Sequence, residues 1–163
     1  MKALPERVES ADSRTSWPLV DRPGFLVRRL HQIHVGLFME ICAEFRITPL
    51  QYSLLTALVD RQYADQTTLA AAVVLDRTTT TGALKRLQAR GLIKRSVFGL
   101  DRRSRLCALS AKGRQLLAAI EAPARKAHRE TLASLDKAER EVFIRLLKKA
   151  VLEGESKPKK GRG

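Results

Sequence analysis

The sequence contains little cysteine, no long apolar run and few acidic residues. Only two of its 163 residues are cysteines, Cys42 and Cys107. Both stand within apolar patterns of what we expect to be a cytoplasmic protein, which predicts buried free thiols, with a disulfide or a redox switch as the alternative. No stretch approaches the roughly 20 apolar residues that span a bilayer. The first residues are polar and mixed in charge, so they do not form a secretory signal.

Basic residues outnumber acidic ones, 31 against 17, which leaves a formal net charge of +14. Such an excess suits a polyanionic partner, either nucleic acid or an anionic surface. A membrane is disfavoured because the basic residues cluster in one motif and do not follow a single amphipathic helix. The length allows one domain with an accessory element.

The sequence also lacks the patterns that support catalysis. It has no glycine-rich phosphate loop, no nucleophile paired with a base and no recognisable carboxylate pair, so we expect neither an enzyme nor a cofactor. His31 and His34 stand three residues apart, on one face of a predicted helix. Because no third ligand accompanies them and His128 lies far along the chain, we predict no metal site.

The most informative pattern lies in residues 65–109. A short helix, a turn, a second helix rich in threonine and basic residues, and a basic hairpin follow one another there. This order is typical of a winged helix-turn-helix, whose second helix can enter a DNA major groove. Between Arg77 and Arg105, nine Lys or Arg stand against one acid, Asp101. A solvated basic face without a partner is the alternative.

Periodicity and capping residues delimit the expected elements. Apolar residues spaced by three and four predict one long amphipathic helix over 25–45. Thr48 and Pro49 open a second helix that ends near residue 60. We further expect helices over 66–74 and 77–90 with N-caps at Asp65 and Asp76, a stop at Gly91, strands over 92–96 and 105–109, a helix from Ser110 kinked at Pro123, and a last helix capped by Asp136 and Glu139.

The expected fold class is therefore mainly α with a small β-wing. The helices outside the motif carry more apolar surface than a small winged helix can cover, which favours a dimer. A twofold dimer sets two recognition helices about 34–36 Å apart and matches a palindromic site. The predicted organisation is a flexible arm over 1–16, dimerisation helices over 17–47 and 110–153, a DNA-binding lobe over 48–109 and a disordered basic tail over 154–163.

The predicted recognition helix presents side chains suited to reading DNA. Threonine hydroxyls can donate or accept, threonine methyls can touch thymine methyls, and Arg or Lys can reach guanine edges. Threonines whose hydroxyls are satisfied locally are the alternative. In the wing, Asp101 is expected to orient Arg103. The candidate DNA-binding residues are Arg77, Thr78, Thr79, Thr81, Gly82, Lys85 and Arg86 on the helix, with Arg102 and Arg103 on the wing.

The segments ITPLQYSLLTAL, DRTTTTGALKRLQARGLIKR and DRRSRLCALSAKGRQLL resemble the MarR family of bacterial transcriptional regulators. The resemblance covers roughly residues 25–150, and its more specific features are Asp101 with Arg103 and the Leu-Ser-x-x-Gly stretch that ends at Gly113. It implies a winged-helix homodimer whose terminal helices form the interface and which binds a palindromic operator. One departure is Gly82, where members often carry Arg.

The resemblance also implies a small anionic aromatic ligand between the dimerisation helices and the DNA-binding lobe. A histidine on the apolar stripe, His34, could pair with a carboxylate while Trp17 and Phe38 sandwich a ring; an interface histidine is the alternative. His31, Gln32 and Arg46 are further candidates. The stretch RRLHQIHVGLF resembles members that repress nicotinate-type catabolic operons (the NicR/BpsR group), which favours a hydroxylated pyridine or benzene carboxylate.

The sequence thus predicts a ligand-responsive repressor that binds duplex DNA as a homodimer. An architectural DNA-binding protein without a small-molecule effector is the alternative, because the basic tail and the net charge would suit it equally.

Overall fold

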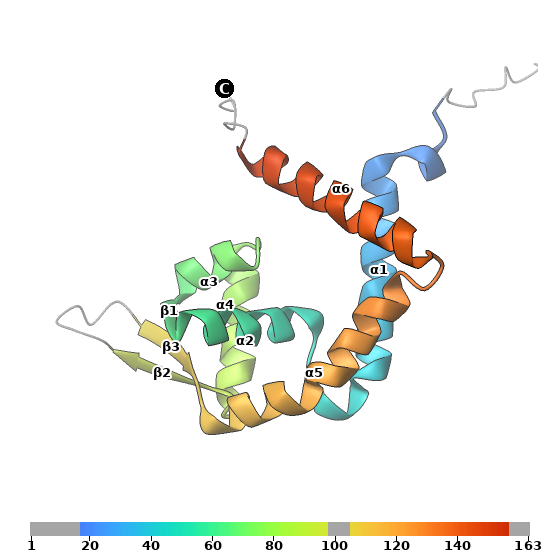
Figure 1. Cartoon of the computed structure of the whole chain (residues 1–163). Helices are drawn as coiled ribbons and strands as arrows, with labels where there is room; N and C mark the ends of the chain where they lie inside the picture. Colours follow the sequence, from blue (N-terminus) through green and yellow to red (C-terminus); the bar gives the residue numbers. More distant parts are fainter. Residues whose placement is uncertain (1–16, 98–104, 157–163) are drawn as a thin grey trace, which may run out of the picture.

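The computed structural model describes residues 17–97 and 105–156, and places the predicted DNA-binding lobe beside a pair of packed helices (Figure 1). The predicted N-terminal arm over 1–16, the wing residues Arg102 and Arg103, and residues 157–163 of the predicted tail lie outside the described residues. None of the described helices is long and apolar enough to cross a bilayer.

Helix α1 (Pro23–Ile41) packs along α5 (Ala111–Thr131), while α6 (Lys137–Ser156) crosses α1 and stays largely exposed (Figure 1). A 3-10 turn, η1 (Leu19–Asp21), precedes α1. The predicted helix over 25–45 is wrong at both ends. Pro23 supplies the first position of α1, where its missing N–H costs little. The chain leaves the α-helix after Ile41 and tightens into a second 3-10 turn, η2 (Ala43–Phe45), which ends at left-handed Arg46 (φ 50°).

Three helices form the core of the DNA-binding lobe: α2 (Pro49–Arg61), α3 (Gln66–Ala72) and α4 (Arg77–Ala89). The predicted caps are confirmed, since Asp65 accepts from Thr68 N at 2.7 Å and Asp76 from Thr79 N at 2.8 Å. Thr48 and Gln51 exchange side-chain and backbone hydrogen bonds in a capping box. Each cap satisfies N–H groups that a first helical turn leaves free. As predicted, Gly91 follows α4 in a left-handed conformation (φ 70°).

A three-stranded antiparallel sheet completes the lobe, in the order β1-β3-β2. Strands β2 (Ile93–Val97) and β3 (Arg105–Leu109) lie close to their predicted positions. The sequence did not predict β1 (Tyr63–Asp65), which pairs Ala64 with Cys107. A strand of three residues is too short to show alternation, so only its pairing with β3 reveals it.

One apolar core joins the two parts of the molecule. Leu54, Leu58, Leu84 and Leu87 of the lobe share a buried cluster with Phe38 of α1 and with Ile120, Ala124 and Ala127 of α5. Cys42 and Cys107 are buried free thiols within this cluster, as predicted. A ligand or mutation that shifts α1 against α5 therefore acts directly on the packing of the lobe.

Helix α5 runs from the sheet to α1 and changes direction along its length (Figure 1). Pro123 lies inside it, where proline removes one helical hydrogen bond, so the predicted kink has its physical cause. At the start of α6, the backbone N–H of Asp136 donates to the Glu139 carboxylate and that of Glu139 donates to the Asp136 carboxylate, at 2.9 Å each. These bonds confirm the predicted capping pair. Helix α6 continues through Ser156, so the prediction of a disordered tail from residue 154 was wrong for its first three residues.

Candidate DNA-binding face and ligand cavity

Helix α4 has a buried face and an outward face that carries the predicted DNA-reading residues. The buried face consists of Thr80, Ala83, Leu84 and Leu87. Helical spacing then turns the remaining positions toward solvent. Arg77, Thr78, Thr79, Lys85 and Arg86 are exposed, and Thr81 and Gly82 are half-buried at the border. The structure brings these seven residues together on one side, whereas their contacts with DNA stay predictions.

Local hydrogen bonds already engage the threonine hydroxyls of α4. The Thr79 hydroxyl donates to the Asp76 carboxylate at 2.6 Å, and the Thr81 hydroxyl donates to Arg77 O at 2.6 Å. Gln66 of α3 also donates to the Thr81 hydroxyl. Local satisfaction, the alternative considered for the threonines, thus holds for Thr79 and Thr81 in the DNA-free chain. The Thr79 oxygen still has a lone pair, which can accept from a cytosine or adenine amino group in the major groove.

Asp76 stays ionised at the N-terminus of the recognition helix. Hydrogen bonds from the Thr79 hydroxyl and the Thr79 backbone N–H hold the pKa of this carboxyl below its usual value. The carboxylate accepts from the Thr79 N–H, one of the groups that could otherwise bind an anion at this helix end. Phosphate binding by the cationic side chains of Arg77, Lys85 and Arg86 stays a prediction.

Arg90, the C-cap of α4, holds this helix against the 3-10 turn that follows α1. Its guanidinium donates to Phe45 O at 2.9 Å and to Arg46 O. Both carbonyls belong to the 3-10 turn that follows α1 and its cap. A guanidinium holds two such acceptors with its fixed fork of donors. This bond pair links the orientation of α4 to α1.

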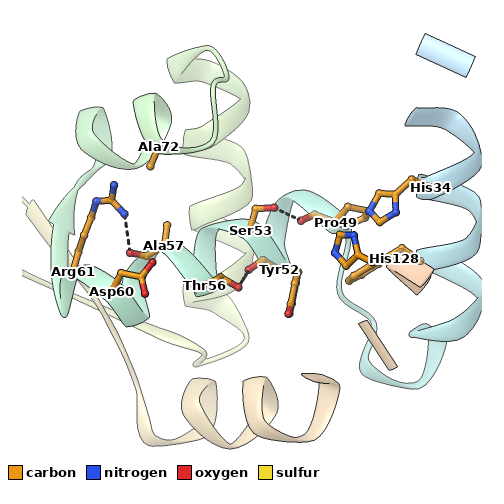
Figure 2. Close-up of a pocket in the computed structure, with 11 residues that line it drawn as sticks. His34, Pro49, Tyr52, Ser53, Thr56, Ala57, Asp60, Arg61, Ala72 and His128 are labelled. Carbon is orange, nitrogen blue, oxygen red and sulfur yellow. Dashed lines mark hydrogen bonds between the residues drawn. The ribbon is translucent and has the colours of Figure 1, made fainter. Parts of the chain in front are cut away.

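A cavity of about 310 Å³ lies between helices α1 and α5 and the lobe, and we call it the ligand cavity. Figure 2 shows residues of α2 along its length, with the two histidines at one end and Arg61 and Asp60 at the other. Its lining consists of His34 and Phe38 of α1, Pro49, Tyr52, Ser53, Thr56, Ala57, Asp60 and Arg61 of α2, Ala72 of α3, and His128 of α5.

A second hollow of about 530 Å³, the adjoining cavity, leads toward the recognition helix. It shares His34, Pro49, Ser53 and Ala72 with the ligand cavity and extends to residues 73–75. Those three residues form the turn between α3 and α4. The two cavities together therefore run from α1 and α5 to the turn that positions the recognition helix.

The histidine end of the ligand cavity is aromatic. The rings of His34 and His128 stack with centroids 4.6 Å apart, and Phe38 lies 6.0 Å from His34 and 5.5 Å from Tyr52. Burial of His34 lowers its pKa, and the neighbouring His128 and His31 lower it further. His34 is therefore a neutral imidazole at pH 7. A planar ring can contact these aromatic faces with favourable geometry.

The opposite end of the ligand cavity supplies charge and hydroxyl groups. Arg61 brings a guanidinium that also donates to Ala57 O at 3.3 Å. Ser53 and Thr56 donate their hydroxyl protons to backbone carbonyls one turn earlier, at 3.0 Å each. At the edge, the Tyr52 hydroxyl donates to Glu121 at 3.3 Å, and burial followed by that carboxylate raises the pKa of the phenol. A carboxylate on a ligand would find its cationic partner at Arg61.

The predicted ligand residues separate into two groups. His34 and Phe38 line the ligand cavity, and His31 lines the adjoining cavity. Trp17, Gln32 and Arg46 line neither. The predicted sandwich of a ring between Trp17 and Phe38 does not form within one chain, because Trp17 precedes the start of α1 at Pro23 and about 22 Å of helix rise then follows before Phe38.

Sequence reasoning missed the contribution of α2 to this cavity. Tyr52, Ser53, Thr56 and Asp60 recur at helical spacing and form a polar stripe beside the buried leucines. That spacing was visible in the sequence, but nothing in it showed that the stripe faces α1. His128 also lines the cavity, although 94 residues separate it from His34 in the chain.

A third hollow of about 660 Å³, the apolar groove, lies between α1, α5 and α6. Among its lining residues, Leu26, Val27 and Ile33 of α1 and Ile144 of α6 keep between 39% and 58% of their surface exposed. Val142, Leu146, Val151 and Leu152 of α6 are further apolar residues with exposed side chains. Contiguous apolar surface of this kind marks a protein interface.

The short helices, the outward basic helix and the antiparallel sheet together define a winged helix-turn-helix DNA-binding protein. The sequence model of the MarR family matches residues 47–104. The transcriptional repressor NicR of Pseudomonas putida is 31% identical over 84% of this chain and 87% of its own length. The chain belongs to the MarR family of transcriptional regulators.

Two solved structures resemble the chain along most of its length. The PcaV regulator of Streptomyces coelicolor, solved in complex with its natural ligand, is 31% identical over 84% of this chain and 96% of that chain, with a TM-score of 0.75. BpsR of Bordetella bronchiseptica is 32% identical over 78% of this chain and 97% of that chain, with a TM-score of 0.74. The study of BpsR concerns regulation of its DNA binding by 6-hydroxynicotinic acid.

Proposed function

We propose that the protein is a homodimeric repressor that binds a palindromic operator, and that a small aromatic carboxylate in the ligand cavity modulates this binding. One observation carries the proposal: the ligand cavity and the adjoining cavity run from α1 and α5 to the turn before α4. A molecule bound there contacts both the dimerisation helices and the segment that positions the recognition helix.

The apolar groove supports the dimer. Its apolar side chains on α1 and α6 remain exposed in the single chain, and two copies related by a twofold axis would bury them against each other. A closed dimer then sets the distance between two α4 helices. Allosteric coupling free energies are typically about 1–3 kcal/mol. A ligand that favours a differently spaced dimer by this amount changes operator affinity by about one to two orders of magnitude.

The dimensions and chemistry of the ligand cavity support a single-ring acid. At about 310 Å³ it falls at the small end of ligand-binding cavities. Phe38 and Tyr52 offer aromatic contact, and Arg61 offers a cation for a carboxylate. The similarity to BpsR, whose study concerns 6-hydroxynicotinic acid, favours the same class of ligand here.

The test begins with duplexes that the full-length protein selects from a random pool. We expect a palindromic consensus, a footprint of limited length, and a dimer in solution at the concentrations used. Fluorescence anisotropy with that duplex, with and without millimolar 6-hydroxynicotinate or hydroxybenzoates, then measures the ligand effect; nicotinamide, which lacks the carboxylate, is the control. Uniform coating of DNA with no consensus would instead identify an architectural protein. A consensus with no response to any acid would refute the effector.

The Arg61→Met variant tests the carboxylate partner. It should bind DNA as the wild type does and lose most of its response to acids. Arg125→Met is a matched control, because Arg125 is exposed on α5 and pairs with Glu121 one turn away. Equal responses in the two variants would contradict the assignment of Arg61.

A further inference from the structure

The hydrogen bonds of Thr131 determine which nitrogen of His34 carries the proton. The Thr131 hydroxyl lies 2.8 Å from Ala127 O and 3.0 Å from His34 Nδ1. A carbonyl oxygen can only accept, so the single hydroxyl proton of Thr131 points to Ala127. The contact with His34 must then be Nδ1–H donating to the threonine oxygen.

The second nitrogen of His34 is consequently a bare acceptor. The ring is neutral, with its one proton on Nδ1, so Nε2 presents a lone pair. Within the described residues Nε2 makes no hydrogen bond, and it does not belong to the buried polar atoms without a partner. It is therefore reachable from the cavities that the His34 ring borders.

The charged and titratable groups around His34 keep it in this state. His31 on the same helix and His128 on α5 both disfavour a charge on the ring. From α2, Tyr52, Asp60 and Arg61 line the same cavity, and Arg29 of α1 lines the apolar groove that His34 also borders. Asp60 is the only carboxylate in the described lining of the three hollows, and Figure 2 shows it at the opposite end of the ligand cavity.

We propose that His34 selects effectors by accepting a hydrogen bond at Nε2 from a ring hydroxyl or ring N–H. This inference rests on the proposed ligand-binding function and reverses the role first expected for His34, which was to pair with the carboxylate. A carboxylate beside a lone pair is repelled, whereas a hydroxyl or pyridone N–H supplies the proton that the lone pair accepts.

The two possible roles of His34 give opposite pH dependence. As an acceptor, His34 loses its lone pair when it is protonated, so affinity for a hydroxylated acid falls as pH drops through the lowered pKa of His34. As a cationic partner of a carboxylate, it would bind better on acidification. The sign of the change therefore distinguishes the roles without a mutation.

The experiment is calorimetric titration of the full chain with matched pairs: benzoate against 4-hydroxybenzoate, and nicotinate against 6-hydroxynicotinate. We expect the hydroxylated member to bind roughly tenfold more tightly, as one additional hydrogen bond provides. The affinity for the hydroxylated member should decrease as the pH is lowered from about 8 to about 5.5. Equal binding within each pair, or tighter binding at low pH, would overturn the proposal while leaving the effector function intact. Binding of no acid at all would refute the proposed function itself.

The Thr131→Val variant tests the device that orients the proton. Without the threonine oxygen, Nδ1 has no acceptor and either nitrogen can carry the proton, so discrimination within each pair should shrink several-fold while the parent acids bind as before. Thr67→Val, at an exposed position of α3, is the matched control and should keep the full discrimination. His34→Gln, which retains an acceptor, should keep part of it, and His34→Leu should abolish it. Full discrimination in both Thr131→Val and His34→Leu would contradict the role of His34.

Discussion

Replacing Gly113 by alanine should destabilise the protein far more than any helical propensity predicts. Gly113 lies in the first turn of α5, where the helix approaches the start of β2. A Cβ at this position would lie 2.1 Å from Leu92 O and 3.1 Å from Leu92 C. A normal C···O contact is about 3.3 Å, so the two backbones must separate by about 1 Å. Both atoms are backbone atoms, and no side chain can rotate to relieve the overlap.

The separation also breaks a local network. Leu92 O accepts from Ser110 N at 3.1 Å, while the Ser110 hydroxyl donates to Gly91 O at 2.6 Å and accepts from Gly113 N at 2.9 Å. Breaking two hydrogen bonds costs about 2 kcal/mol, and backbone strain costs about 2 kcal/mol more. The gain of about 1 kcal/mol from alanine in a helix leaves a net loss of about 3 kcal/mol. For a chain of this size, that is a fall in Tm of about 9 °C.

Gly82→Ala is the matched control for Gly113→Ala. Gly82 is also a helical glycine, but its nearest neighbour to an added Cβ is the mobile guanidinium of Arg86 at 3.5 Å, an ordinary contact. This variant should gain about 1 kcal/mol and melt about 3 °C higher. Both are measured by thermal unfolding at one protein concentration, because dimerisation makes Tm concentration-dependent. A Gly113→Ala protein as stable as the wild type would refute the account of the Leu-Ser-x-x-Gly stretch.

Val74, Arg86 and Asp76 each give a further prediction. Val74 is a β-branched residue with a φ of 54° in the turn after α3. Val74→Gly should therefore stabilise the protein by about 1 kcal/mol and raise its Tm by about 3 °C. An unchanged or lower Tm would show that this backbone conformation is unstrained. Arg86→Ala should weaken DNA binding with little change in sequence preference. In anisotropy measurements over a range of salt, the slope of the logarithm of affinity against the logarithm of salt concentration should become shallower by about 0.9 for each phosphate that the variant no longer neutralises. Arg125→Ala on α5 should leave this slope unaltered. Because the pKa of Asp76 is lowered in the folded state, its carboxylate stabilises the fold above the unfolded-state pKa of about 3.9, and this stabilisation is lost as pH falls through the folded-state pKa. In acid unfolding curves, Asp76→Asn should therefore be less stable than the wild type at neutral pH and lose stability less steeply at low pH. A decline as steep as that of the wild type would exclude this role of the cap.

The sequence alone was sufficient for the features that depend on neighbours within one helical turn. Thr48, Asp65, Asp76 and Ser110 cap the helices that follow them because a side chain reaches a backbone N–H three residues on. The outward face of α4 follows from its period, since buried positions recur every three or four residues. The winged helix-turn-helix and its family could therefore be predicted.

Only the tertiary structure decided which distant residues meet. Strand β1 forms because β3 lies beside it and pairs with it. Arg90 can donate to Phe45 O because the fold places η2 next to the end of α4. Trp17 lies away from Phe38 because most of α1 separates them. The proton position on His34 depends on Thr131, 97 residues further along the chain. Periodicity specifies which face of a helix is apolar or polar, but it carries no information about the partner across that face. The ligand cavity is built from such cross-helix contacts, and they arise only when α1, α2 and α5 pack together.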